Sequence, residues 1–247
     1  MKAKHFVTAL CPTYRRPRFV EQAVKLFMRQ TWKNSELLIL DDSPPGERTT
    51  VKESARVKAI RFDQRLSQGE KLNVGLDIAQ GEFVAHFDDD DWMADSRLIR
   101  QVETLVMEPV DACGYTCETL LTTGDARFWR FDRTFRRDKL LVGNATIPLG
   151  IPFMDGTAVF RRSVVGPTRY PTVTVGQKVQ FIHDLWTKQG AKLRALPNPG
   201  VYVYVRHAPR SGAANTWQYL EDRRLLPLPK PSWFPNSELD FYRRVSS

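Results

Sequence analysis

Phe87-Asp88-Asp89-Asp90-Asp91-Trp92 places four carboxylates in a row between two aromatic residues. Residues 82–87 are rich in apolar and aromatic residues and follow Gly81, which predicts a short buried strand. Asp95 is well placed to cap a helix that we expect over 96–107. The acidic run therefore follows the carboxyl end of a strand, which is where open α/β sheets bind their ligands.

The acidic run by itself leaves two interpretations open. Four adjacent acids repel one another, so a folded domain that keeps them at a strand end needs a cation to neutralise them. A divalent metal prefers such hard oxygen ligands. A run of charges is also typical of a solvated surface turn. The rest of the chain decides between the two interpretations.

The composition is that of a globular protein with an excess of positive charge. The 247 residues suit one large domain, with a hydrophobic fraction of 42% and a charged fraction of 26%. The net charge of +9 indicates polyanionic partners, such as nucleic acid, acidic glycans or an anionic membrane face. The longest uncharged run, 140–154, is too short for a bilayer span, so we expect no transmembrane segment.

Two further features indicate a cytoplasmic protein. The first residues lead directly into a strand-like segment instead of a secretory signal. Cys11, Cys113 and Cys117 form an odd set, for which reduced core thiols are favoured, with a Cys113–Cys117 bridge as the alternative. We therefore expect a cytoplasmic location, either free or peripheral at a membrane. The oligomeric state stays open.

Strands and helices alternate along the chain up to the acidic run, which predicts a mainly parallel sheet with crossover helices. We expect strands at 5–10, 37–40 and 57–62, a turn at 11–17, and helices at 17–30, 47–56 and 70–80. The polar or acidic turns after the strands, 14–16, 41–42 and 88–91, should converge on one edge of the sheet. No Gly-x-Gly-x-x-Gly and no P-loop pattern occurs, so a dinucleotide site is not indicated.

The second half of the chain is less regular. A hairpin of strands 111–121 and 126–135 is predicted around 122–125. A helix is predicted over 177–189, with Val179, Ile182, Leu185 and Trp186 facing inward and Gly190 ending it. We expect further strands at 157–160, 192–196 and 201–205. The segment from residue 226, rich in proline and aromatic residues, is expected to be irregular and packed over the domain, or to form a lid.

Several of these segments resemble the family 2 type of GT-A glycosyltransferases. Residues 11–17 are similar to its Pro-x-Tyr-Asn-Arg loop, with Arg15 where Asn is usual, and residues 40–43 resemble its Val-Asp-Asp-Gly/Ser turn. Residues 69–83 are similar to its Asn-x-Gly helix and the entry to its metal strand. Residues 87–92 then resemble its Asp-x-Asp motif. Weaker likenesses at 156–162, 183–186 and 204–207 extend the resemblance over roughly residues 5–207.

The resemblance implies an α/β GT-A fold, with a mainly parallel central sheet flanked by helices and a smaller mixed sheet on the acceptor side. It implies a metal-dependent, inverting enzyme that moves a hexosyl or pentosyl group from a nucleotide diphosphate sugar, UDP-linked, to a hydroxyl acceptor. Residues 1–110 would form the donor-binding half and 111–225 the acceptor-binding and catalytic half of one domain. Residues 226–247 would form a C-terminal tail.

The resemblance also implies roles for individual residues. The ligands of Mn²⁺ or Mg²⁺ would be Asp88, Asp90 and His207. Asp184 would be the general base, but His183 replaces the usual Glu, so which of the two is the base stays open. Asp91 has no assigned role, and a solvated position is the alternative for each basic residue taken singly. The donor would be bound by Pro12, Tyr14, Arg16, Asp41, Asp42, Arg65, Lys71, Asp88 and Asp89.

The acceptor is not decided by the sequence. A basic segment suits a hydroxylated base in modified DNA and equally an anionic lipid-linked saccharide or glycolipid. The basic residues of this segment are Arg127, Arg130, Arg133, Arg136, Arg137 and Lys139. Two alternatives from other classes are a nucleic-acid- or sugar-binding module without turnover, and a nucleotidyltransferase.

Overall fold

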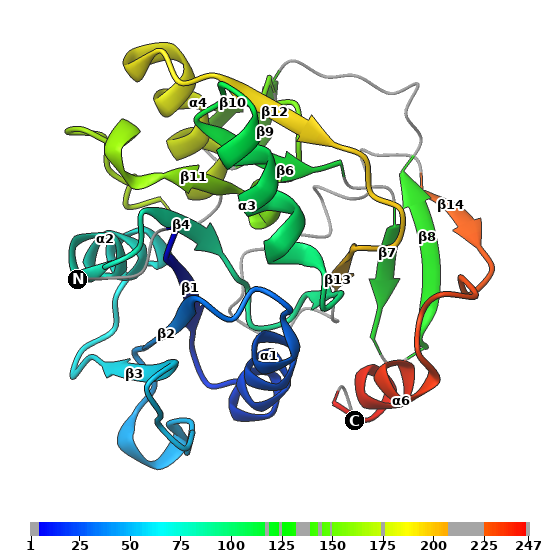
Figure 1. Cartoon of the computed structure of the whole chain (residues 1–247). Helices are drawn as coiled ribbons and strands as arrows, with labels where there is room; N and C mark the ends of the chain where they lie inside the picture. Colours follow the sequence, from blue (N-terminus) through cyan, green and yellow to red (C-terminus); the bar gives the residue numbers. More distant parts are fainter. Residues whose placement is uncertain are drawn as a thin grey trace.

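The computed structural model describes residues 5–116, 119–123, 125–131, 139–142, 145–148, 150–173, 176–206 and 225–245, with the backbone alone at 131, 139–142 and 145–148. A seven-stranded sheet forms the centre of the molecule (Figure 1). In spatial order its strands are β12 (Leu193–Leu196), β6 (Ala112–Tyr115), β11 (Val159–Arg161), β4 (Phe83–His86), β1 (Val7–Thr13), β2 (Ser35–Asp41) and β3 (Val57–Arg61).

The pairing within this sheet is mainly parallel. Strand β1 pairs in parallel with β2 on one side and with β4 on the other, and β2 continues in parallel to β3. Strand β11 is antiparallel to both of its neighbours, β4 and β6. The predicted mainly parallel α/β sheet is therefore confirmed.

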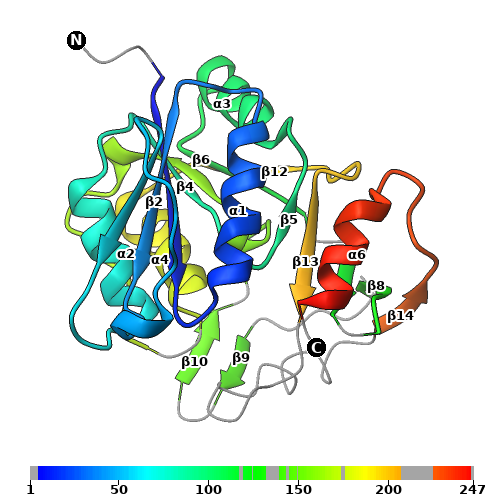
Figure 2. The same cartoon turned by 90° about the horizontal axis from the view of Figure 1, so that it is seen from below.

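Helices cover both faces of the central sheet (Figure 2). Helices α1 (Pro17–Arg29) and α3 (Arg97–Met107) contribute Phe27 and Leu105 to one core. Helices α2 (Gln68–Ile78) and α4 (Gln177–Gln189) contribute Leu72 and Phe181 to the other. Each large apolar side chain buried in this way stabilises the fold by about 1.5–3 kcal/mol.

Local sequence explains where the helices begin and end. Pro17 stands in the first turn of α1, where its missing N–H leaves no hydrogen bond unmade. Ser67 and Glu70 form a capping box at the start of α2, each side chain accepting a hydrogen bond from the other's backbone N–H. Gly190 ends α4 with a φ of 70°, a left-handed conformation that favours glycine. The predicted bounds of α4 are confirmed.

A second, five-stranded sheet lies beside the first. Its strands, in spatial order, are β14 (Leu225–Leu228), β8 (Arg127–Phe131), β7 (Thr119–Thr122), β13 (Tyr202–Arg206) and β5 (Trp92–Met93). The pairing is mixed, because β7 is parallel to β13 and antiparallel to β8. Strands β9 (Lys139–Val142) and β10 (Ala145–Pro148) form a separate antiparallel pair. The acidic run leaves β4 in the first sheet and enters β5 in the second, so it bridges the two sheets.

The C-terminal segment is more regular than predicted. It contains β14 and a helix, α6 (Asn236–Arg244). Between them, the ring of Phe234 lies 5.0 Å from that of Trp92 and 5.1 Å from that of Phe128. The expectation of an irregular tail was wrong, because Pro227 lies on an edge strand and Pro235 precedes α6, two positions where proline is tolerated.

Three local predictions in the first half were also wrong. Strand β1 continues through Thr13, so residues 11–13 are strand and the turn begins at Tyr14. Asp95 does not cap α3, which follows Ser96; instead, Oδ1 of Asp95 accepts a hydrogen bond from Arg29. The helix expected at 47–56 is absent apart from a single 3₁₀ turn, Pro45–Glu47.

Two predictions in the second half need correction. The strand expected over 111–121 is divided into β6 and β7, which belong to different sheets. Trp186 is 46% exposed and does not face inward. It occupies the outer side of α4, because Phe181, Ile182 and Leu185 already fill the inner side.

The two cysteines in the described part of the chain agree with the expected reduced core thiols. Cys11 and Cys113 are buried free thiols, and Cys117 lies outside the described residues. Burial raises the pKa of Cys113 to about 12, so this thiol stays protonated and inert. No helix in the described part of the chain combines the length and the apolar content that a membrane span requires.

Candidate functional site

The loops after β1, β2 and β4 gather the predicted site residues at one edge of the central sheet. From β1 the chain builds the sheet outward in one direction through β2 and β3, and then returns to place β4 on the other side of β1. The carboxyl ends of β1 and β4 are therefore a topological switch point. Open α/β sheets bind their ligands at this position.

Asp89 and Asp91 turn into the protein. Asp89 is 4% exposed, and its carboxylate accepts hydrogen bonds from Thr13 Oγ1 at 2.7 Å and from Arg16 at 3.2 Å. Asp91 is 1% exposed and accepts from the Tyr202 hydroxyl at 2.5 Å and from the Val205 N–H at 2.9 Å. Burial and the neighbouring acids raise the pKa of Asp91 well above its ordinary value. The solvated-turn interpretation is therefore excluded.

Asp88 and Asp90 alternate with these two residues and are more accessible. Asp88 Oδ1 forms an ion pair with the ammonium of Lys178, and Asp90 Oδ2 accepts a hydrogen bond from Arg16 at 2.9 Å. A Cβ atom at Gly156 would lie 3.0 Å from Asp88 Oδ2 and 3.3 Å from the Tyr202 hydroxyl. A side chain at residue 156 would therefore crowd the acids, so a glycine suits the close approach of the backbone here.

The four acids fit a divalent cation in charge and in ligand type. Among the described residues, two basic side chains, Arg16 and Lys178, form ion pairs with carboxylates of the four-acid run, so the acids outnumber the cations paired with them. Asp88 and Asp90 offer the hard oxygen ligands that Mn²⁺ and Mg²⁺ accept. Among the described residues, no three acidic, histidine or cysteine side chains form a complete metal cage. Further ligands would come from a bound substrate, from water, or from outside the described residues, where His207 lies.

Asp42 forms a second charged cluster at the end of β2. Its carboxylate accepts hydrogen bonds from Lys71 Nζ at 2.7 Å, from the Leu66 N–H at 2.8 Å and from Arg65. Burial raises the pKa of Asp42, but these bonds outweigh it and hold the pKa below its ordinary value. Lys71 also donates to the Thr13 carbonyl at 2.7 Å. Because Thr13 bonds Asp89 as well, the two clusters are joined through one residue.

An aromatic ring lies beside this cluster. The guanidinium carbon of Arg65 is 3.7 Å from the centre of the Tyr14 ring, and that of Arg15 is 5.1 Å away. A planar cation on an aromatic face is held by the quadrupole of the ring. Tyr14 and Arg65 thus already form a stacked pair next to Asp42. A planar base could join this stack.

Asp41 and Pro12 shape the loops. Asp41 accepts hydrogen bonds from the N–H groups of Ser43, at 2.9 Å, and Thr49, at 3.2 Å, so its carboxylate holds its own turn. Pro12 is buried in β1 opposite Leu40. Arg15 has a φ of 54°, and its N–H donates to Ser43 Oγ at 2.7 Å, which ties the first loop to the second. This left-handed conformation favours asparagine, the residue that the similar motif usually carries here. Donor contacts of Asp41 and Pro12 stay predictions.

A comparison of the sequence with models of known protein families assigns the chain to a family. The sequence model described as "Glycosyl transferase family 2" matches residues 8–166, well over half of the chain. The chain belongs to this family. The matched range contains the loops after β1, β2 and β4 and ends before α4.

Two curated relatives of this family 2 chain are glucosyltransferases. One is the GalNAc(5)-diNAcBac-PP-undecaprenol beta-1,3-glucosyltransferase of Campylobacter jejuni, 34% identical over 34% of this chain and 29% of its own length. Another is the Escherichia coli UDP-Glc:alpha-D-GlcNAc-diphosphoundecaprenol beta-1,3-glucosyltransferase WfgD, 28% identical over 41% of this chain and 42% of its own length. The matches thus span less than half the length of either relative.

Solved structures show the same fold. The crystal structure of S. aureus TarS 1-349 in complex with UDP-GlcNAc has a TM-score of 0.60 at 14% identity, over 88% of this chain and 64% of that one. The mannosyltransferase PcManGT from Pyrobaculum calidifontis, in complex with GDP-Man and Mn2+, has a TM-score of 0.56 at 17% identity, over 97% of this chain and 69% of that one. The predicted glycosyltransferase fold is confirmed.

In this family 2 chain, Asp184 contacts its own helix. Its carboxylate accepts hydrogen bonds from Gln180 at 2.7 Å and from Lys188 at 2.9 Å, each four positions away on α4. His183 Nδ1 lies 3.8 Å from Asp184 Oδ1 and makes no hydrogen bond. Six residues separate Asp184 from Lys178, which is about 9 Å along the helix and about 120° around it. Its catalytic role stays a prediction.

Lys178 is the α4 side chain that reaches the acids, and sequence reasoning missed it. It stands three positions before Phe181 and four before Ile182, so it continues the apolar stripe of the helix. A lysine within such a stripe was a readable signal of a buried charge. Thr13 and Tyr202 were also missed, and neither carries a comparable signal, because their partners are distant in sequence.

A buried network holds the end of β4 below the acids. His86 Nδ1 contacts the Asp155 carbonyl at 2.7 Å, and Nε2 contacts the Tyr170 hydroxyl at 2.7 Å. A carbonyl only accepts, so Nδ1 carries the proton and Nε2 accepts from the hydroxyl. Burial and Lys178 lower the pKa of His86 to about 3, which keeps the ring neutral. Asn73 and Tyr170 add two reciprocal bonds of 2.8 and 2.9 Å between α2 and this segment.

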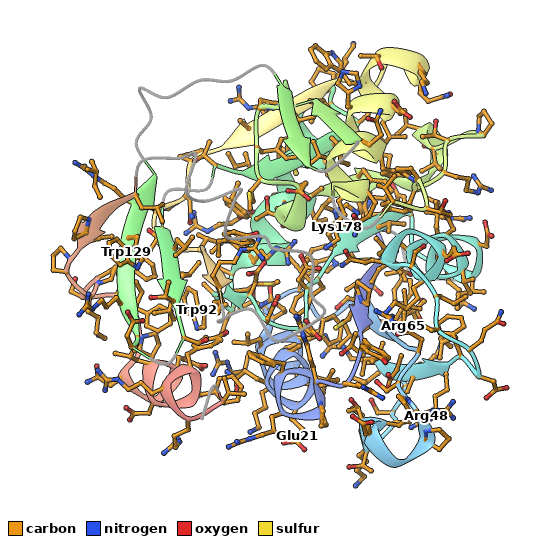
Figure 3. The ribbon with its side chains drawn as sticks, turned by 180° about the vertical axis from the view of Figure 1, so that it is seen from behind. Glu21, Arg48, Arg65, Trp92, Trp129 and Lys178 are labelled. Atoms are coloured by element: carbon orange, nitrogen blue, oxygen red, sulfur yellow. The ribbon has the colours of Figure 1, made fainter. Side chains whose placement is uncertain are left out.

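The basic segment of the second half is described only in part. Arg127 and Arg130 lie on β8, and the Arg127 side chain is 70% exposed. The three arginines at 133, 136 and 137 lie outside the described residues, as does the side chain of Lys139. Figure 3 places Lys178 near the centre of the molecule and Trp129, also on β8, at its edge.

Proposed function

We propose that the chain transfers a sugar from a nucleotide diphosphate sugar to a hydroxyl acceptor. The observation that carries this proposal is the junction at Thr13. It joins the Asp42 cluster after β2 to the acidic run after β4, at the switch point of the sheet. A nucleoside-binding cluster next to an acid cluster of excess negative charge suits a nucleoside diphosphate held together with a cation.

The nucleoside would bind at the Asp42 cluster. Asp42 would accept from the base or ribose, and Tyr14 and Arg65 would stack on the base. Lys71 and Arg16 would face the diphosphate, where paired basic groups suit phosphate oxygens. We assign uridine as the base, because the relative WfgD is named for UDP-Glc and the TarS structure holds UDP-GlcNAc.

Asp88 and Asp90 would hold the divalent ion, with His207 as a further candidate ligand. The similar PcManGT structure is titled with Mn2+ beside GDP-Man, which supports this assignment. The ion would offset the negative charge that develops on the leaving diphosphate. Asp89 and Asp91 would act indirectly, because their oxygens already bond Thr13, Arg16, Tyr202 and Val205.

Asp184 would deprotonate the acceptor hydroxyl, which would then displace the diphosphate in a single in-line step with inversion at the anomeric carbon. In the present arrangement Lys188 holds its carboxylate. Because the Lys188 side chain is 65% exposed, the bond can be exchanged for an acceptor at a small free-energy cost. His183, whose Nδ1 makes no hydrogen bond, is the alternative base.

The acceptor we propose is a saccharide linked to a lipid diphosphate. Both relatives described above are named for acceptors on diphosphoundecaprenol. The net charge of +9 and the exposed Arg127 suit an acceptor that carries phosphate at a membrane surface. The phosphates of DNA would suit the same positive charge, so a hydroxylated base in modified DNA is the alternative acceptor that the test includes.

The test measures nucleoside diphosphate release from UDP- and GDP-sugars with Mn²⁺, with either a lipid-diphosphate saccharide or hydroxymethylated DNA added. We expect a UDP-sugar to turn over, and the lipid-linked acceptor to raise its turnover above hydrolysis. Stimulation by DNA alone would transfer the acceptor assignment to nucleic acid. Release at background with every donor and acceptor would favour a binding module without turnover, and release of inorganic pyrophosphate from nucleoside triphosphates would favour a nucleotidyltransferase.

A further inference from the structure

Lys178 is a buried cation in contact with the acidic run. Its side chain is 6% exposed, and its ammonium forms an ion pair with Asp88 Oδ1. It comes from the first turn of α4, directly after Gln177, whereas Arg16 directly precedes α1. The two cations hold different acids of the predicted metal pair, Asp88 and Asp90.

This position is unfavourable for a lysine unless the acids hold it there. The amino end of a helix carries partial positive charge, which repels a cation in the first turn. Burial also disfavours the charged form, and the ion pair with Asp88 offsets that cost. The acids and the lysine therefore stabilise each other, and an ion that binds Asp88 is repelled by a cation already paired with the same carboxylate.

We propose that Lys178 competes with the divalent metal for Asp88, so that the metal binds strongly only together with a nucleoside diphosphate. The proposal rests on the function proposed above, because it takes Asp88 and Asp90 as the metal ligands. A divalent ion alone meets the ammonium on the same carboxylate and finds few protein ligands among the described residues. A diphosphate brings further oxygen ligands and new negative charge for the displaced ammonium. Lys178 is thus a positioning residue that couples metal binding to donor binding.

The surroundings of Lys178 support an exchange of partners. Asp155 and Asp91 are further acids close enough for their charges to act on the ammonium, so it keeps acidic neighbours if it moves from Asp88. Gly156 leaves room next to Asp88 Oδ2, since a Cβ there would come within 3.0 Å.

Binding of Mn²⁺ alone tests the proposal, with the free ion measured by electron paramagnetic resonance. Lys178→Met should raise the Mn²⁺ affinity without nucleotide by about tenfold or more, the effect of removing one charge at contact distance. The matched control is Lys188→Met on the same helix, which removes an ammonium from Asp184 and should leave the affinity unchanged. UDP should raise the Mn²⁺ affinity of the wild type more than that of Lys178→Met.

Two outcomes would overturn the proposal. One is an equal Mn²⁺ affinity of the wild type and Lys178→Met, and the other is an equal rise in Mn²⁺ affinity in Lys178→Met and Lys188→Met. Where Lys178→Met does not fold, Lys178→Gln and Lys178→Arg replace it. The Gln variant, which keeps a donor without the charge, should bind Mn²⁺ more tightly than the Arg variant. A failure of the proposed function is separate, because it appears as absent turnover of every nucleotide sugar, whereas this test reads metal binding alone.

Discussion

The proposed donor side, after β2 and β4, and the proposed acceptor side, on α4 and β8, use their charges differently. After β2 and β4, Asp42 and Asp91 are buried and bond groups that are distant in sequence, such as Lys71 and Tyr202. On the other side, Asp184 bonds residues four positions away on its own helix, and Arg127 lies 3.5 Å from Asp125 in its own hairpin. Long-range buried contacts exist only in the folded protein, whereas local contacts need only their own element.

The difference teaches which substitutions should affect stability and which should affect activity. Removing one partner of a buried pair leaves an uncompensated charge, which destabilises a protein by several kcal/mol. Removing an exposed local pair changes stability by less than about 1 kcal/mol. We therefore expect substitutions on the donor side to lower stability as well as binding, and substitutions on the acceptor side to lower activity alone.

The largest effect is expected from Asp42→Ala. It leaves the Lys71 ammonium, whose side chain is 4% exposed, without its carboxylate, so the free energy of unfolding should fall by about 3–5 kcal/mol. Denaturant unfolding measures this loss. Asp63→Ala is the control, because Asp63 is fully exposed and meets Arg48 only at 3.4 Å. Equal stabilities of Asp42→Ala and the control would remove the distinction between the two sides.

The Asp42 carboxylate should also make the stability of the protein depend on pH. Because the pKa of Asp42 is lower in the folded than in the unfolded protein, its contribution is present above the unfolded value of about 3.9 and is lost as the pH falls below it. The wild type should therefore lose more stability than Asp42→Ala on acidification below about pH 4. Parallel stability curves of the two proteins through this range would contradict the assignment.

The next effect concerns activity on the acceptor side. Asp184→Asn should lower kcat by at least about a hundredfold, the usual contribution of a general base. Asp184 is 9% exposed, but Asn keeps its size and one acceptor oxygen and its partner Lys188 is 65% exposed, so the melting temperature should stay near that of the wild type. Steady-state kinetics and a melting curve on the same preparation check both parts. If His183→Gln causes the loss of kcat and Asp184→Asn does not, the base is His183.

A smaller effect on stability is expected from Tyr202→Phe. The hydroxyl donates to Asp91 at 2.5 Å, and without it the buried carboxylate keeps the Val205 N–H as a donor. The free energy of unfolding should fall by about 1–3 kcal/mol. Tyr204→Phe on the same strand is the control, since its ring is only partly buried. A loss as small as that of the control would mean that Asp91 does not depend on this bond.

The smallest effect on stability is expected from Arg127→Ala, which should change the free energy of unfolding by less than about 0.5 kcal/mol. If the acceptor carries phosphate, the variant should bind it more weakly, and with a smaller dependence on salt, than the wild type. Lys52→Ala, on the segment before β3, controls for the loss of one positive charge. Unchanged acceptor binding in Arg127→Ala would remove β8 from the acceptor site.

Much of the fold could be predicted from the sequence, because its helices and central strands are periodic. The spacing of Ile182 and Leu185, with Gly190 after them, predicted α4, and the apolar run before Asp41 predicted β2. The five-stranded sheet could not be predicted in the same way. Its strand β5 has only two residues and pairs with β13, which is distant in sequence. Neither hydrophobic periodicity nor a local turn therefore predicts it.

The candidate site could be predicted in position and only partly in detail. The acids after β4 and the Asp41-Asp42 turn were expected at one edge, because parallel strands end there. The alternation of the acidic run, with Asp89 and Asp91 inward, depends on Thr13 and Tyr202, which no local pattern connects to it. Lys178 was not predicted, because the resemblance assigns a role on this helix to Asp184 alone.

The most direct test of the account is the melting temperature of the wild type with UDP and Mn²⁺ together and with each alone. A ligand at about 100 times its Kd adds about 2.7 kcal/mol, which corresponds to a rise of about 5–10 °C for a domain of this size. We predict this rise with the pair, a much smaller one with either component alone, and none in Asp90→Asn. The absence of any metal-dependent shift with UDP, GDP or another nucleoside diphosphate would contradict the assignment of the acidic run and the Asp42 cluster as a donor site.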